Sequence, residues 1–208
     1  MQAGSGVNKL LLHPVAKPLV FALALAPFAW LAWRAVFDQL GANPQEALIR
    51  GLGDWALRFM CLVLAVTPVR SIAAWPALLR FRRMLGLFAF FYAVMHLLAY
   101  AVFDMGLDAE EIVRDILKRP FILLGTLTLL LLLPLAATSF NRAIRLLGAA
   151  RWQRLHRLVY GAAITMLLHF FWMRAGKNDF VEVFVYAGFV ALLLGWRLRQ
   201  ALQRRQAA

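Results

Sequence analysis

Two histidines stand in the middle of long apolar stretches, where polar side chains are costly and are usually retained for a function. His96 lies within FYAVMHLLAYAVF and His169 lies within ITMLLHFFWM. A neutral imidazole is a good iron ligand, and haem iron commonly takes histidine as an axial ligand. Neighbouring phenylalanines, Phe91 and Phe170 among them, would supply flat apolar walls for a porphyrin. These residues predict a haem held between His96 and His169.

The other two histidines have different surroundings. His156 lies in WQRLHRLVY, 13 residues before His169, and Arg83 precedes His96 by the same 13 residues. Arg83 therefore occupies, on the span of His96, the position that corresponds to His156 on the span of His169. Arginine stays protonated and is not an ordinary iron ligand. Its guanidinium could bind a haem propionate or simply belong to a basic belt. His156 is a candidate ligand of a second haem, whereas His13, in LLHPVAKP, is interpreted as a surface residue.

The spacing between His156 and His169 decides whether they share one face of a helix. Thirteen residues at about 100° each leave the two side chains about 140° apart on an ideal helix. They would then hold separate haems on different sides of that helix, unless an irregularity realigns them. Both arrangements stay open from the sequence.

The composition indicates which elements carry these residues. The 208 residues are 63% hydrophobic and 16% charged, whereas an average soluble chain is about 45–50% apolar and about 25% charged. The single cysteine, Cys61, excludes a scaffold of intramolecular disulfides. Spans of about 20 residues can cross the hydrocarbon core. We therefore expect one all-α integral membrane domain over residues 1–208, a six-helix bundle with spans at about 18–37, 51–69, 84–103, 120–137, 152–173 and 180–196.

The charged residues are sorted to two sides of this bundle. The N-terminus, the loops after 51–69 and 120–137, and the C-terminus hold 15 of the 23 basic residues and none of the ten acids. Lysine and arginine in short loops favour the cytoplasmic side, so both termini are predicted to be cytoplasmic. The net charge of +13 then reflects topology and anionic headgroups, and no nucleic acid is needed to explain it. The 15 residues are Lys9, Lys17, Arg70, Arg80, Arg82, Arg83, Arg142, Arg145, Arg151, Arg154, Arg157, Arg197, Arg199, Arg204 and Arg205.

The depths of the two buried histidines agree. Spans 84–103 and 152–173 both run outward, and at about 1.5 Å per residue His96 lies about 18 Å along the first and His169 about 21 Å along the second. No CxxCH motif occurs, so a haem here would be b-type and not covalently attached. Two buried histidines that bond only to carbonyls or hydroxyls are the alternative at this point.

Signatures of substrate chemistry are missing from the sequence. It has no Walker loop, no GxGxxG after a strand, no GxSxG and no zinc-spaced His/Cys cluster. The chain is therefore predicted to conduct electrons without a substrate site of its own. A small transporter or assembly factor with the histidines as proton relays is the alternative. We expect no intramembrane carboxylate partner for the histidines apart from Glu182 near one end of a span, which speaks against a relay.

Three segments carry a family resemblance: RFRRMLGLFAFFYAVMHLLAY at 80–100, RPFILLGTL at 119–127 and RWQRLHRLVYGAAITMLLHFFW at 151–172. With six spans, they resemble the ferric reductase-like transmembrane domain that NADPH oxidases and STEAP reductases share. The resemblance is closer to the MsrQ (YedZ) family, the haem-bearing membrane subunits of the bacterial MsrPQ methionine sulfoxide reductase systems.

This resemblance implies that His96, His156 and His169 are haem-associated, that the haem is b-type and that FMN is a further cofactor. It also implies a multi-pass protein of the bacterial inner membrane. Electrons would come from a cytosolic flavin reductase or from quinol and would pass to periplasmic MsrP, a molybdopterin subunit that reduces methionine sulfoxide in proteins. NADPH oxidases carry histidine pairs on both helices, whereas Arg83 replaces one member here, so the ligation of a second haem stays open.

Overall fold

The computed structural model describes residues 3–176 and 178–206, and every regular element in that part of the chain is a helix. The side chain of Arg205, counted above with the basic residues, lies outside the described part. The elements are α1 (Ala3–Leu12), α2 (Ala16–Val36), α3 (Pro44–Ile72), η1 (Pro76–Leu78), α4 (Leu79–Ala99), the π-helical turn η2 (Tyr100–Asp104), α5 (Ala109–Lys118), α6 (Pro120–Ala137), α7 (Asn141–Leu147), α8 (Ala149–Leu155), α9 (Leu158–Ala175) and α10 (Val181–Gln206).

Six helical segments of the described chain are long and apolar enough to cross a membrane. They consist of α2, α3, η1 to η2, α6, α8 to α9, and α10. Large apolar side chains such as Leu23, Leu130 and Leu192 lie exposed on their outer faces. Surfaces of this kind suit a hydrocarbon solvent and not water. The protein is therefore an all-helical, multi-pass membrane protein, and the expected six spans are confirmed.

The spans differ from the sequence prediction mainly at their ends. The second begins at Pro44 and not near residue 51, because Asn43 accepts a hydrogen bond from the Glu46 backbone N–H and a proline occupies the first helical position. The sixth continues to Gln206. The fifth, expected as one helix over 152–173, is interrupted at His156.

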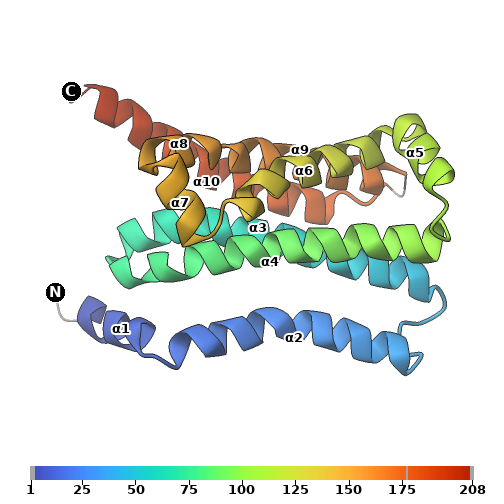
Figure 1. Ribbon diagram of the computed structural model, residues 1–208, viewed down its shortest axis with the longest axis horizontal. Coiled ribbons are helices and arrows are strands. Elements are labelled where there is room, and N and C mark those ends of the chain that lie inside the picture. The colour runs from blue at the N-terminus through green and yellow to red at the C-terminus, as the bar shows by residue number, and fades with distance from the viewer. Residues whose placement is uncertain (1–2, 177, 207–208) are drawn as a thin grey trace.

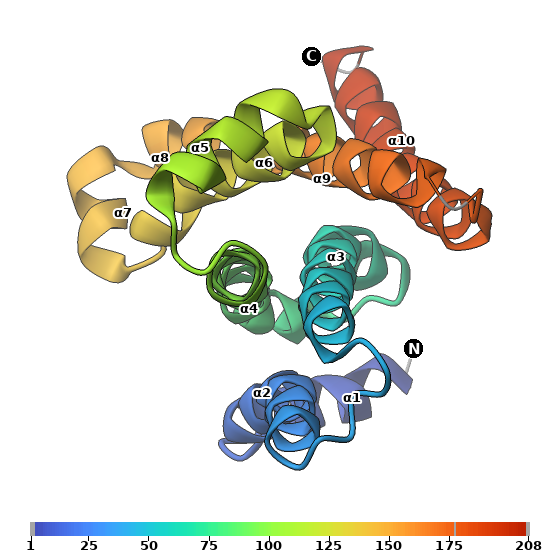
Figure 2. The ribbon, with the colours of Figure 1, turned by 90° about the vertical axis from the view of Figure 1, so that its right-hand side faces the viewer.

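The helices form three layers that run along one axis (Figure 1). Viewed from one end, the α3–α4 pair lies between α2 on one side and an arc of α6, α9 and α10 on the other (Figure 2). Both termini lie at the same end of the bundle, together with α7 and α8, and α5 lies at the opposite end (Figure 1). We call these the terminal end and the α5 end.

Tyr92 joins the first two layers. Its side chain on α4 is fully buried, and its hydroxyl donates to the Ala24 carbonyl at 2.8 Å while accepting from the Phe28 backbone N–H at 3.0 Å. These two groups would bond to each other in an uninterrupted α2, so the tyrosine hydroxyl is inserted into the helical ladder. The ring of Phe59 on α3 stacks on Tyr92 with centroids 5.2 Å apart. This cluster holds α2, α3 and α4 together.

Candidate functional site

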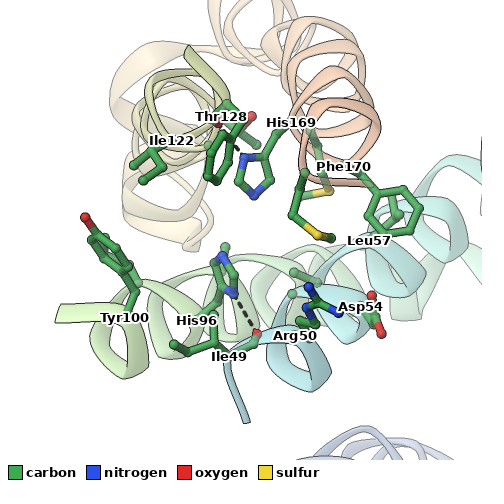
Figure 3. A pocket seen from close by; sticks show the side chains of 18 of the residues that line it. Ile49, Arg50, Asp54, Leu57, His96, Tyr100, Ile122, Thr128, His169 and Phe170 are labelled. Atoms are coloured by element: carbon green, nitrogen blue, oxygen red, sulfur yellow. Dashed lines mark hydrogen bonds between the residues drawn. The ribbon is translucent and has the colours of Figure 1, made fainter. Parts of the chain in front are cut away.

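His96 on α4 and His169 on α9 face each other across a cavity between the second and third layers (Figure 3). Their ring centroids are 6.0 Å apart and their planes meet at 77°. His96 Nδ1 lies 2.8 Å from the Ile49 carbonyl oxygen on α3, and His169 Nδ1 lies 2.6 Å from the Phe121 carbonyl oxygen on α6. A carbonyl oxygen only accepts, so each Nδ1 carries the ring proton and each Nε2 keeps a free lone pair.

The separation of the two rings fits a shared metal. An imidazole nitrogen binds a transition metal at about 2 Å, and the ring centre lies about 1 Å further back, so opposed imidazoles on one metal have centroids about 6 Å apart. No cluster of three or more His, Cys, Asp or Glu side chains suited to a metal occurs among the described residues. Two histidines therefore suit a metal whose remaining ligands come from a prosthetic group, and iron in a porphyrin is such a metal.

Two glycines let the histidine rings lie against neighbouring helices. A Cβ on Gly53 would lie 3.1 Å from His96 Nδ1, and a Cβ on Gly125 would lie 3.0 Å from His169 Nδ1. Gly53 follows Ile49 by four residues and Gly125 follows Phe121 by four, so each ring contacts one carbonyl and the bare Cα one turn later. The same arrangement thus fixes both rings. Sequence reasoning missed these glycines, although a lone glycine inside an apolar helix often marks close packing.

The cavity around the histidines has a volume of about 440 Å³ and lies toward the α5 end. This volume is within the usual range for cofactor sites, about 300–1,000 Å³. Apolar side chains such as Leu57 and Phe170 line its inner part, while Arg50 and Arg119 line it toward the α5 end. Figure 3 shows Arg50 beside His96. An apolar cavity with guanidinium groups at one end suits a flat macrocycle that carries carboxylates.

Asp54 corrects the sequence analysis. The charge sorting assigns it to the outer side with the other acids, although residue 54 already falls near the start of the expected second span, 51–69. Because α3 begins at Pro44, Asp54 lies well inside that span. Its carboxylate also lines the cavity that holds His96. The statement that Glu182 alone among the carboxylates enters a span was therefore wrong.

A polar network closes the α5 end of the cavity. Tyr100 donates to Asp115 with an oxygen separation of 2.5 Å, and Arg119 forms two hydrogen bonds to the same carboxylate. Partial burial raises the pKa of Asp115, but the hydrogen bonds from Arg119 and Tyr100 outweigh it and hold the pKa below its ordinary value. The network joins η2, α5 and the start of α6. It was not anticipated from the sequence.

His156 lies apart from this pair, in the break between α8 and α9. There the backbone N–H groups of Arg157, Val159 and Tyr160 bond three residues back instead of four. The helix irregularity that the sequence left open is therefore present, and the angle for an ideal helix does not apply. The His156 ring stacks on Trp152 at 3.8 Å, with its Nδ1 3.1 Å from the Trp152 carbonyl oxygen. Its Nε2 is buried and has no hydrogen-bond partner within the described chain.

Arg83 and His13 complete the predicted set. Arg83 Nη1 donates to Asn141 Oδ1 on α7 at 2.7 Å, so its guanidinium is held at the terminal end of the bundle. Its hydrogen bond is to α7, and no hydrogen bond between Arg83 and His156 occurs among the described residues. His13 is exposed, and its Nδ1 accepts from the Val15 backbone N–H at 3.3 Å.

Comparisons with known proteins agree with this architecture. Residues 52–167 match the family described as the ferric reductase like transmembrane component, which covers more than half of the chain. The class is thus a ferric reductase-like membrane protein. Three relatives carry the name protein-methionine-sulfoxide reductase heme-binding subunit MsrQ.

The relative from Polaromonas naphthalenivorans is 67% identical over 93% of this chain and 89% of its own length. Those from Herminiimonas arsenicoxydans and Bordetella pertussis are 49% and 47% identical over 91% and 92% of this chain, and over 87% and 93% of their own lengths. The chain belongs to the MsrQ family.

Proposed function

We propose that the protein is a b-type haem electron-transfer subunit in which His96 and His169 would hold one haem through their Nε2 atoms. The observation that carries this proposal is the pair of opposed imidazoles, 6.0 Å apart, each with its Nδ1 bonded to a helix carbonyl. The relatives' name, which specifies a heme-binding subunit, supports the cofactor. When bound, a haem supplies a one-electron carrier inside the membrane.

The residues around the pair have distinct tasks. The Ile49 and Phe121 carbonyls fix the ring tautomers and make each Nε2 a stronger donor to iron. Gly53 and Gly125 allow the rings to reach those carbonyls. Apolar side chains such as Phe170 keep water from the inner part of the cavity. Arg50 and Arg119, which line its α5 end, are proposed to bind propionate carboxylates in addition to pairing with Glu46 and Asp115.

The direction of transfer follows from the sorting of charges. The terminal end, rich in arginine, is proposed to be cytoplasmic, and the α5 end, which holds the histidine pair, is proposed to be periplasmic. Electrons would enter near His156 and Arg83 and leave through the outer haem. The donor is a cytosolic flavin reductase or quinol, FMN is a further cofactor, and the acceptor is periplasmic MsrP, which reduces protein methionine sulfoxide. The relatives' name supports a methionine sulfoxide reductase system.

A second haem is proposed on His156. Its Nε2 is buried without a hydrogen-bond partner in the described chain, and burial of such an atom is costly unless a ligand takes its lone pair. Arg83 is proposed to bind a propionate of this haem. The two haems would lie at different depths and provide a stepwise path across the membrane.

The alternative function, a proton relay, gains one carboxylate, because Asp54 lines the cavity beside His96. A relay needs each histidine to bond to a group that can pass the proton on. Here both Nδ1 protons are directed at backbone carbonyls, which end such a chain. The geometry therefore favours electron transfer.

A visible spectrum of the purified protein tests the proposal. We expect the reduced spectrum of a low-spin b-type haem, and we expect His96→Ala and His169→Ala to lose the signal of the outer haem while still inserting into the membrane. His13→Ala is the control and should keep the full spectrum. A His96→Ala protein with unchanged haem content and an unchanged reduced spectrum would refute the ligand pair.

The acceptor needs a separate assay. Membranes whose haem has been reduced from the inside receive oxidised MsrP outside, with and without methionine sulfoxide. Reoxidation that depends on both supports MsrP as the partner. Haem that stays reduced under these conditions removes MsrP from the proposal and leaves the ligand pair untouched.

A further inference from the structure

A second cavity lies at the terminal end of the bundle, between α3, α4, α9 and α10. Its volume is about 240 Å³, and it shares no lining residue with the cavity that holds His96 and His169. Thr67 and Tyr160 form part of its wall. Its most distinctive feature is a group of four arginines, namely Arg70, Arg82, Arg197 and Arg204.

Two polar atoms that belong to residues lining this cavity are buried without a hydrogen-bond partner. Arg197 is anchored because its Nη2 donates to the Leu64 carbonyl at 2.7 Å and its guanidinium carbon lies 5.5 Å from the centre of the Tyr160 ring. Its Nη1 and the Thr67 Oγ1 have no partner within the described chain. Buried donors are normally satisfied, and a charged donor most of all. The pair therefore indicates a group from outside the chain.

The chain supplies no carboxylate to balance these arginines. Residues 55–103, 116–176 and 183–204, which include every lining residue of the cavity, contain no aspartate or glutamate. The ion pairs among the described residues, such as Arg50 with Glu46, Arg119 with Asp115 and Arg174 with Asp179, belong to the α5 end. The counter-charge for these arginines therefore comes from outside the chain.

We propose that this cavity is a binding site for a phosphate group, with Arg197 Nη1 and Thr67 Oγ1 as its innermost donors. A guanidinium and a hydroxyl together offer several donors to one tetrahedral oxyanion, and the remaining arginines supply a positive field around it. The volume is below the range of about 300–1,000 Å³ that is usual for whole cofactors. The cavity therefore suits a headgroup or a terminal phosphate and not an entire nucleotide.

The phosphate has two potential sources, and the site would bind either through the same atoms. Basic pockets between membrane helices on the cytoplasmic side bind headgroups of anionic phospholipids. A soluble phosphate monoester could enter from the same side. The experiment therefore has two arms, both on the full-length, haem-loaded protein in a neutral detergent.

In the lipid arm, the protein is mixed with phosphatidylglycerol or phosphatidylcholine, and the retained lipid is measured by native mass spectrometry. In the soluble arm, inorganic phosphate, flavin mononucleotide and riboflavin are titrated in a calorimeter. Arg197→Gln should weaken the binding of the retained anion about tenfold, as expected for the loss of one hydrogen bond from a charged group. Thr67→Val should weaken it about threefold, as expected for one neutral hydrogen bond. Arg199→Gln is the matched control, since Arg199 is an exposed neighbour on α10 that does not line the cavity.

Each outcome decides the proposal. Preferential retention of phosphatidylglycerol, sensitive to Arg197→Gln, supports the site with a lipid as the source. Binding of phosphate or of flavin mononucleotide but not of riboflavin, with the same sensitivity, supports it with a soluble source. Equal binding by Arg197→Gln and Arg199→Gln, or no binding in either arm, overturns it. Loss of haem absorbance in Arg197→Gln also overturns it, because the guanidinium would then serve a haem carboxylate. Thr67→Val gives the same readout if Arg197→Gln does not fold.

Discussion

The two ends of the bundle treat their charged groups differently. At the α5 end, Arg119 binds Asp115, Arg174 binds both Asp179 and Glu182, and the two histidines bond to helix carbonyls. At the terminal end, the stretches of sequence that carry the arginines contain no aspartate or glutamate. Buried atoms without partners, His156 Nε2 and Arg197 Nη1, lie there.

This difference shows what each end needs from outside. The α5 end pairs its charged side chains within its own chain and, among the described residues, leaves the two histidine Nε2 atoms and the buried Arg174 Nε without partners. It is therefore organised around one ligand, between two rings whose positions are already fixed. The terminal end holds more positive charge than the chain can balance, so it depends on anions and partners. Preorganised sites keep their geometry when a distant residue changes, whereas sites of the second kind depend on salt and lipid composition.

The largest effect is expected in a test of topology, which asks whether the two ends of the bundle face opposite sides of the membrane. In a Cys61→Ser background, Leu107→Cys at the α5 end should react with an impermeant thiol reagent in intact spheroplasts, and Leu146→Cys at the terminal end should react only after lysis. Both leucines are well exposed, at 65% and 76%, so accessibility on each side is matched. Labelling of Leu146→Cys before lysis would reverse the orientation and the direction of electron transfer.

Adding a side chain at Gly125 should remove most of the haem that is proposed to lie between His96 and His169, which we call the outer haem. A Cβ there would lie 3.0 Å from the His169 ring, which its bond to the Phe121 carbonyl holds in place. We expect Gly125→Ala to reduce the content of the outer haem several-fold and Gly125→Val to abolish it, as measured by the reduced spectrum. Gly161→Ala is the control, because its Cβ would make an ordinary contact of 3.6 Å with Leu131. Full haem content in Gly125→Val would show that the ring need not lie against α6.

Replacement of His156 should remove about half of the bound haem if each of the two candidate positions holds one group. His156→Ala should therefore lower the haem-to-protein ratio from about two to about one and leave the His96–His169 signal intact. The pyridine haemochrome assay gives the ratio, and His13→Ala controls for loss of any histidine. An unchanged ratio would leave the terminal end without a haem and confine electron transfer to the α5 end.

The smallest effect is expected at the network of Tyr100, Asp115 and Arg119, which closes the α5 end of the cavity that holds the two histidines. Because the pKa of Asp115 is lowered in the folded protein, its contribution to stability is full above the ordinary carboxyl pKa and is lost as the pH falls through the lowered value. Asp115→Asn should reduce the free energy of unfolding by about 1 kcal/mol near neutral pH. Thermal melts of both proteins from pH 7 to pH 3 should converge at the acid end. A constant difference across this range would contradict the role of the ionised carboxylate.

Much of the fold was readable from the sequence because a membrane restricts the choice. Hydrocarbon cannot satisfy backbone groups, so each long apolar run must be a helix, and the sorting of arginine and acids predicts which ends lie together. His96 and His169 could be paired because helix rise converts sequence position into depth. Both termini do lie at one end, and the two rings do face each other.

Other features depended on contacts between segments far apart in the sequence. Ile49 and Phe121 act through backbone carbonyls, which carry no residue signature, and Gly53 matters only because a ring from another helix lies over it. The break at His156 arises without proline or glycine, so local propensity gave no warning of it. Sequence alone determined the helices, their depth and their charge, because these follow from solvent and helix geometry; only the tertiary structure decided which neighbouring backbone each side chain would meet.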